Sequence, residues 1–250
     1  MTAPVLRLEG LNKNFGGLAV TRNLNFEMTA GELHAVIGPN GAGKTTLINL
    51  ISGLIPADSG RVVFAGRDVT SLPVPERAKL GMARSFQITS ILPGFSVLEN
   101  VALAVQARMG SSFRFVGEAA AERALNEPAM AALDEIGLTT RAPRLAGHLS
   151  HGEKRALELA IALAMQPKLL LLDEPMAGVG RDETDQLIDV LARLKGRFPI
   201  LLVEHDMTAV FALADRISVL LYGAILTSGT PDAVRADPQV VAAYLGEEME

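Results

Sequence analysis

The chain has 250 residues, 49% of them hydrophobic and 20% charged, a balance typical of a folded α/β protein with a sizeable core. The net charge of −5, without any cluster of Lys and Arg, argues against a nucleic-acid partner. The lack of cysteine excludes disulfides and thiolate zinc sites, and the lack of a run of 18 apolar residues predicts that the chain does not itself cross a membrane.

Short strands and then helices are expected in the first 150 residues. Residues 96–110 begin a helix with Ser96 and Glu99 at the spacing of a capping box. Residues 118–138 form a second helical pattern, with a break expected near Pro128. Before these helices, glycine turns separate four apolar segments that predict strands: LRLEGL (6–11), LNFEM (24–28), LHAVIG (33–38) and RVVFAG (61–66).

The pattern changes after Ser150. A helix is followed by the apolar run LLLLD (169–173), an amphipathic helix over 183–196 and a second apolar run, ILLVEHD (200–206). Apolar runs that alternate with amphipathic helices predict a parallel sheet covered on both faces. Residues 217–226 predict a hairpin that turns at Gly223, and residues 231–246 predict short terminal helices.

A phosphate-binding loop is predicted at GPNGAGKTT, residues 38–46, which follows an apolar strand and begins a helix. Its glycines allow backbone amides to approach a phosphate, Lys44 can reach the β- and γ-phosphates, and the Thr45 hydroxyl can bind Mg²⁺. The alternative, a glycine-rich turn before a helix, does not require this spacing. The loop residues predicted to bind nucleotide are Gly38, Asn40, Gly41, Gly43, Lys44, Thr45 and Thr46.

Polar residues at the ends of two buried strands complete a predicted ATPase site. Asp173 follows the leucine run and can hold Mg²⁺ through water, while Glu174 can polarise the attacking water. His205 ends the next apolar strand and is predicted to contact the γ-phosphate; a lone histidine there is otherwise a structural hydrogen-bonding group. Gln87, where the helical region begins, is predicted to sense Mg²⁺ and water, with an ordinary loop glutamine as the alternative.

A second anion site is predicted more than 100 residues beyond the loop. In LSHGEKR (149–155), Ser150 and Gly152 stand where a helix begins, and a helix N-terminus attracts anions through its unpaired N–H groups and its dipole.

These motifs together resemble the ATP-binding subunits of ABC transporters in order and spacing. The resemblance implies a P-loop NTPase (RecA-like) core with an N-terminal antiparallel β-subdomain and an inserted α-helical subdomain. The whole chain, 1–250, would be one ABC ATPase domain, with the insert at 88–150 and the core at 1–87 and 151–250. It also implies that two subunits pack head to tail, so that Ser150 and Gly152 contact the γ-phosphate on the other subunit. Phe15 would stack on adenine; the alternative is a core phenylalanine.

The segment LSHGE (149–153) corresponds to the signature motif of this family and departs from its common form, L-S-G-G-Q. His151 replaces the first glycine and Glu153 the glutamine, whereas Ser150 and Gly152 remain. After Pro175 the chain reads MAGVG instead of the commoner S-A-L-D, so Gly180 lacks the carboxylate that the family uses between subunits. These departures bear on the coupling of the two sites more than on hydrolysis.

The segments EPMAGVGRDET, LLVEHDM and AYLGEE resemble the subfamily that imports branched-chain amino acids. Urea importers and the subunit exporting lipopolysaccharide share parts of this pattern and remain alternatives. The resemblance implies ATP and Mg²⁺, transmembrane permease subunits, a second ATPase subunit that is identical or paralogous, and a periplasmic or extracellular solute-binding protein. It implies a cytoplasmic chain peripheral on the inner face of the membrane.

Two further alternatives are disfavoured. Soluble ABC ATPases of DNA repair carry long coiled-coil inserts, and those of translation usually have tandem cassettes; this chain has neither pattern. A P-loop kinase of small molecules would have no use for the LSHGE motif.

Overall fold

The computed structural model describes residues 3–84, 91–110 and 123–245, with side chains up to residue 242. The chain forms two compact units. Unit 1 contains the described residues of 1–82, 168–174 and 194–250, and unit 2 those of 83–167 and 175–193. No helix in the described ranges is long and apolar enough to span a membrane.

Unit 1 contains an antiparallel sheet of the order β2-β1-β4-β5, as predicted for the N-terminal subdomain. Its strands are β1 (Leu6–Phe15), β2 (Leu18–Met28), β4 (Ser59–Phe64) and β5 (Arg67–Asp68). Alternate side chains of β1 and β4 are buried, since successive residues of a strand face opposite sides of the sheet.

The second sheet has the order β10-β9-β3-β8-β7-β6. The strands β3 (Leu33–Ile37), β7 (Leu169–Asp173), β8 (Ile200–Val203) and β9 (Arg216–Leu221) are parallel where they pair, while β10 (Ala224–Gly229) returns antiparallel to β9 through the predicted turn at Gly223. The remaining strand is β6 (Met82–Arg84). All residues of β3, β7 and β8 are buried, which confirms that the apolar runs form central strands.

One hydrophobic core joins the two sheets of unit 1. It includes Leu6, Phe64, Leu171 and Val203, together with Leu47 from helix α1 (Lys44–Ser52). The other helices of this unit are α2 (Val74–Lys79), α7 (Met207–Leu213), α8 (Pro231–Arg235) and α9 (Pro238–Leu245), the last two confirming the predicted terminal helices.

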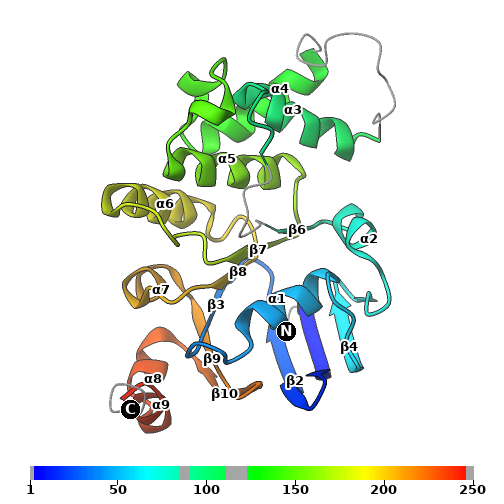
Figure 1. Cartoon of the computed structure of the whole chain (residues 1–250), viewed down its shortest axis with the longest axis vertical. Coiled ribbons are helices and arrows are strands. Elements are labelled where there is room, and N and C mark those ends of the chain that lie inside the picture. Colours follow the sequence, from blue (N-terminus) through cyan, green and yellow to red (C-terminus); the bar gives the residue numbers. More distant parts are fainter. Residues whose placement is uncertain (1–2, 85–90, 111–122, 246–250) are drawn as a thin grey trace. The chain divides into compact units, whose positions relative to one another are not determined.

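Unit 2 is helical. Helices α3 (Val97–Arg108), α4 (Arg123–Glu135) and α5 (His151–Ala164) pack against one another, and Figure 1 shows them grouped together in green. The 3-10 turns η2 (Thr139–Arg141) and η3 (Ala146–His148) lead into α5, and α6 (Arg181–Leu194) belongs to this unit up to Arg193. The capping box predicted at Ser96 and Glu99 is present at the start of α3.

The break predicted near Pro128 is wrong. Helix α4 continues through Pro128, although proline removes one helical hydrogen bond and crowds the preceding turn. Leu125, Ala129 and Leu133, four residues apart, are buried on one face. The packing of this face against α3 and α5 outweighs the local preference of proline.

The helical unit extends beyond the predicted insert at 88–150. It also takes in α5 and residues 175–193, because α5 packs against α3 and α4 and these contacts tie it to the insert.

Candidate active site

The predicted phosphate loop connects β3 to α1 in unit 1. Gly43, at the N-cap of α1, has a left-handed backbone with φ of 107°, and no side chain caps this helix end. At Gly38, a Cβ atom would lie 2.2 Å from the carbonyl oxygen of Leu220, so only glycine fits the path of the loop. The loop therefore presents an open helix N-terminus that can accept an anion.

The Lys44 side chain folds back onto this loop. Its Nζ donates hydrogen bonds to the carbonyl oxygens of Gly38 at 2.5 Å and Pro39 at 3.0 Å, and the residue is only 7% exposed. The ammonium is thus held among backbone atoms of the loop itself. Of the neighbouring predicted residues, Asn40 and Thr45 are exposed.

The strand register brings the other unit 1 candidates to one edge of the sheet. Asp173, at the end of β7, pairs with Val203 of β8, which in turn pairs with Val36 of β3. The three strands therefore end together, and the residues that follow them lie at the same carboxyl edge, where open α/β sheets bind their ligands.

Glu174 has an unusual backbone in this arrangement. Its φ is +48°, a left-handed conformation that costs energy for a residue with a side chain, and its N–H donates to the Val203 carbonyl at 2.8 Å. A strained backbone persists only where surrounding contacts hold it, and such residues cluster at functional sites. The preceding Asp173 is almost fully buried, at 1% exposure.

His205 lies beside Glu174, so two of the predicted catalytic residues are neighbours. Its Nδ1 is 3.9 Å from Glu174 Oε1, and its side chain is 61% exposed. The same nitrogen is 3.7 Å from Oε2 of Glu204, and the residue follows β8 at the carboxyl edge of the sheet.

Sequence reasoning missed Glu204. This carboxylate is fully buried, and its Oε2 accepts hydrogen bonds from the backbone N–H groups of His205 at 2.8 Å and Asp206 at 3.2 Å. It therefore fixes the turn that carries His205. The signal available was a glutamate directly after four apolar strand residues, a place where a carboxylate is buried only with partners.

The residues present fit a magnesium ion. Helix α1, which carries Thr45, packs against β7, which ends at Asp173. A hydroxyl and a carboxylate are hard oxygen ligands, and Mg²⁺ usually takes one or two such protein ligands together with phosphate and water. No group of three or more His, Asp or Glu residues in the described ranges forms an independent metal site. Gln87, the third predicted ligand, lies outside the described residues.

Phe15 is the predicted adenine contact, and the alternative of a core phenylalanine is wrong. The residue ends β1 and is 50% exposed, with the Lys13 ammonium 5.6 Å from its ring centroid. An exposed aromatic face is available for stacking on a base.

The second predicted anion site is the signature turn, residues 149–153, in unit 2. Ser150 is the N-cap of α5, as predicted, and its Oγ accepts the N–H of Glu153 at 3.1 Å, while Glu153 Oε2 accepts the N–H of Ser150 at 3.0 Å. This capping box satisfies two backbone donors at the helix end. Ser150 and His151 are exposed.

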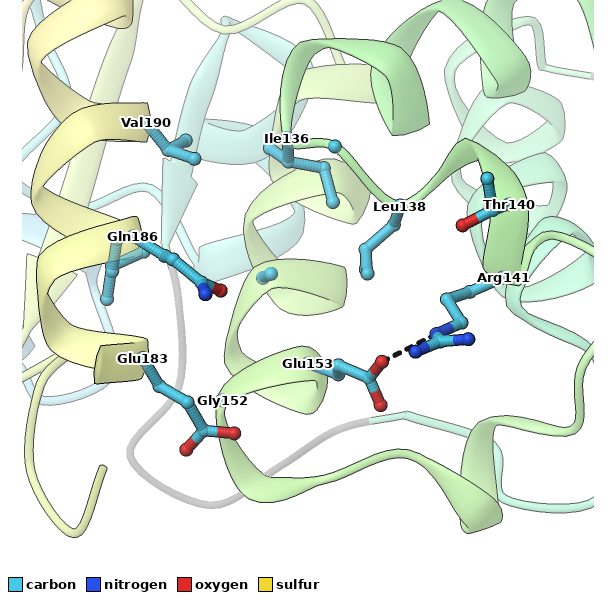
Figure 2. Close-up of a pocket in the computed structure, with 12 residues that line it drawn as sticks. Ile136, Leu138, Thr140, Arg141, Gly152, Glu153, Glu183, Gln186 and Val190 are labelled. Carbon is cyan, nitrogen blue, oxygen red and sulfur yellow. Dashed lines mark hydrogen bonds and ion pairs between the residues drawn. The ribbon is translucent and has the colours of Figure 1, made fainter. Parts of the chain in front are cut away.

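Glu153, which replaces the usual glutamine, is neutralised locally. Its Oε1 accepts a hydrogen bond from Arg141 Nε at 2.7 Å (Figure 2). Partial burial raises the pKa of Glu153, but the hydrogen bonds from Ser150 and Arg141 outweigh this effect and leave the pKa below its ordinary value. The charge is therefore paired with Arg141.

A further carboxylate touches the signature turn. Ser150 Oγ donates to Glu183 Oε1 at 2.7 Å, and a Cβ atom on Gly152 would lie 2.5 Å from Glu183 Cδ. Sequence reasoning gave Glu183 no role, because the contact joins residues 33 apart on two different helices.

A glycine-rich loop between a parallel strand and a helix, with acidic residues after a neighbouring strand, is the arrangement of a P-loop NTPase. Residues 21–177 match the family described as ABC transporter, and residues 224–250 match the family described as branched-chain amino acid ATP-binding cassette transporter. The chain therefore belongs to the ABC transporter family, as an ATP-binding cassette that hydrolyses ATP.

Individual relatives agree over the full length. The high-affinity branched-chain amino acid transport ATP-binding protein LivG of Escherichia coli K12 is 37% identical, with 99% of this chain and all of that protein covered. The corresponding protein BraF of Pseudomonas aeruginosa is 36% identical with the same coverage.

Solved structures share the fold. The ADP conformation of MJ1267, an ATP-binding cassette of an ABC transporter, superposes with a TM-score of 0.85 at 31% identity, covering 98% of this chain and all of the other. A nucleotide-free ATP-binding cassette from an ABC transporter gives a TM-score of 0.84 at 30% identity, covering 97% of this chain and 99% of the other.

Proposed function

We propose that the chain is the ATPase subunit of an importer for branched-chain amino acids. The names of full-length relatives support this cargo, as does the match of residues 224–250 to a branched-chain amino acid cassette family. In this proposal the chain binds a transmembrane permease at the inner face of the membrane, and a solute-binding protein outside delivers the amino acid.

Within one subunit, the loop residues hold the phosphates of ATP. The N–H groups at the start of α1 and the ammonium of Lys44 attract the β- and γ-phosphates. Thr45, Asp173 and Gln87 would hold Mg²⁺, which when bound neutralises phosphate charge. Lys44 has to leave the carbonyl oxygens of Gly38 and Pro39 to reach the nucleotide.

Hydrolysis is assigned to Glu174 and His205. Glu174 accepts a proton from the attacking water, and His205, 3.9 Å from it, donates to the γ-phosphate. The strained backbone of Glu174 and the buried carboxylate of Glu204 support this role, because both fix a side chain at the carboxyl edge of the sheet.

A second ATPase subunit, identical or paralogous, would complete the site. The observation that carries this step is the exposed, serine-capped N-terminus of α5, a second anion site in a sequence that has one GxxxxGK[ST] loop. Ser150 and Gly152 would meet the γ-phosphate on the partner's loop. Hydrolysis then removes the contact that favours the closed dimer, and the permease follows the change.

Transport by the reconstituted system tests the proposal. The cassette, its permease subunits and the solute-binding protein, all taken from neighbouring genes, are placed in proteoliposomes with ATP inside. We expect ATP-dependent uptake of labelled leucine, isoleucine or valine, and none with Glu174→Gln. Uptake of urea instead of leucine would contradict the cargo, while ATP hydrolysis by the reconstituted system without uptake of any solute would contradict the transport role.

A further inference from the structure

The carboxylate of Glu183 occupies the signature turn. Glu183 lies in the first turn of α6 and is half-buried, and its Oε1 accepts the hydrogen bond from Ser150 Oγ at 2.7 Å. Figure 2 shows its side chain directed from α6 toward Gly152 at the start of α5.

The hydrogen-bonding capacity of Ser150 is already used. A serine hydroxyl has a single proton, and here that proton goes to Glu183. The same oxygen accepts the N–H of Glu153 at 3.1 Å as the helix cap. The hydroxyl therefore has no second proton to give to a phosphate while Glu183 is in place.

The Glu183 side chain also fills the space next to the Cα atom of Gly152. An added Cβ atom on this glycine would lie 2.5 Å from Glu183 Cδ and 2.8 Å from both Cβ and Oε1 of the same side chain. A phosphate that approached Gly152 from this side would meet the glutamate, and both groups are negatively charged.

We propose that Glu183 is an internal competitor of the γ-phosphate at the signature turn. This inference rests on the proposed contact of Ser150 with the partner subunit's ATP. In the open subunit Glu183 holds the Ser150 hydroxyl, and closure of the dimer requires the γ-phosphate to displace it. Glu183 is thus a positioning residue that weakens ATP-driven closure and keeps dimers from forming at low ATP.

A cavity next to Glu183 can hold its side chain after displacement from Ser150. Glu183 lines a cavity of about 300 Å³ whose other walls include Leu138, Arg141, Gln186 and Val190 (Figure 2). A carboxylate that turns away from Ser150 into this cavity keeps polar neighbours in Arg141 and Gln186, so its displacement does not leave a buried charge alone.

The test measures ATP-driven dimerisation in a Glu174→Gln background, where hydrolysis is blocked. Glu183→Gln keeps the size of the side chain and removes its charge, and Glu183→Ala removes the side chain. We expect both to lower the dissociation constant of the ATP-bound dimer by about tenfold, because a charged hydrogen-bond competitor is lost. Sedimentation with ATP and with ADP gives the dissociation constants.

A matched control is available on the same helix turn. Asp182 is exposed and lies one residue before Glu183, so Asp182→Asn removes the same charge without touching Ser150. We expect it to change the ATP dimer less than about twofold. Thermal melting without nucleotide checks that all variants fold.

The outcomes separate this inference from the proposed function. If Ser150→Ala weakens the ATP dimer but both Glu183 variants leave it unchanged or weaken it, Glu183 only ties α5 to α6 and the competitor role is wrong. The competitor role is equally wrong if Asp182→Asn strengthens the dimer as much as Glu183→Gln. If Ser150→Ala leaves the dimer unchanged, the shared site itself fails.

Discussion

The N-termini of α1 and α5 are the two candidate anion sites of this chain, and they are built in opposite ways. Helix α1 begins at a glycine, with no side-chain cap and no acidic residue in its first turn. Helix α5 begins with a serine cap, has Glu153 in its first turn and also holds Glu183 through Ser150.

The helix N-terminus of α1 has no side-chain cap, whereas that of α5 is capped by side chains of the same chain. At α1 no side chain caps the helix end, so its N–H groups can donate to a phosphate, and the free energy of binding is expected to be large. At α5 the N–H groups of Ser150 and Glu153 and the Ser150 hydroxyl already have partners within the chain. A phosphate that binds the hydroxyl has to replace its partner, which suits the proposed contact that forms and breaks in each cycle.

Replacing Lys44 should produce the largest effect, and it tests whether the N-terminus of α1 binds the nucleotide. Lys44→Ala removes the cation that is proposed to bind the phosphates, and we expect ATP affinity to fall about 100-fold or more. Isothermal titration or fluorescence of a nucleotide analogue measures this. Lys79→Ala, which removes an exposed lysine of α2, is the control. Unchanged affinity in the first variant would refute the loop assignment.

Glu174→Gln separates binding from hydrolysis. The amide cannot accept the proton of the attacking water, so we expect the hydrolysis rate to fall about 10²- to 10⁴-fold while ATP affinity is retained. Size-exclusion chromatography with ATP should then show a trapped dimer. Rapid turnover by this variant would mean that another group acts as the base.

The local features of both sites could be predicted from the sequence. The loop, the cap at Ser150, the box at Ser96 and the hairpin at Gly223 each depend on residues close together in the chain, and the structure has all four elements. Local hydrogen bonds and backbone preferences decide such features.

Features that depend on packing between distant segments could not be predicted. The continuity of α4 at Pro128 results from burial against two other helices, and the inclusion of α5 in unit 2 has the same cause. Glu183 reaches Ser150 across 33 residues, so nothing near either residue indicates the bond. The sequence gives the identity of each residue but not which distant residues it contacts in the folded protein.

Removing the cap of α5 sharpens the comparison, because an equivalent cap exists at α3. Ser150→Ala and Ser96→Ala each remove the serine of a complete capping box, so we expect each to lower the melting temperature by about 2–4 °C. Only Ser150→Ala should reduce hydrolysis, with ATP binding to the monomer unchanged. Equal loss of activity in both variants would indicate a merely structural role for Ser150.

The smallest effect concerns the charge of Glu153. Burial raises its pKa, but the Ser150 amide and Arg141 lower it more, so the net pKa is below the ordinary 4.5. A carboxylate with a lowered folded pKa stabilises the protein above the unfolded pKa, and the contribution disappears as the pH falls through the folded value.

Glu153→Gln should therefore lower the melting temperature by about 1–3 °C at pH 7, and the difference should shrink below pH 4.5. Glu99→Gln is the matched control, since the pKa of Glu99 is lowered by the hydrogen bonds from Ser96 at the start of α3. Because Glu153 also forms an ion pair with Arg141, Glu153→Gln should lower the melting temperature more than Glu99→Gln does. Equal losses would mean that the cap, and not Arg141, neutralises the signature turn.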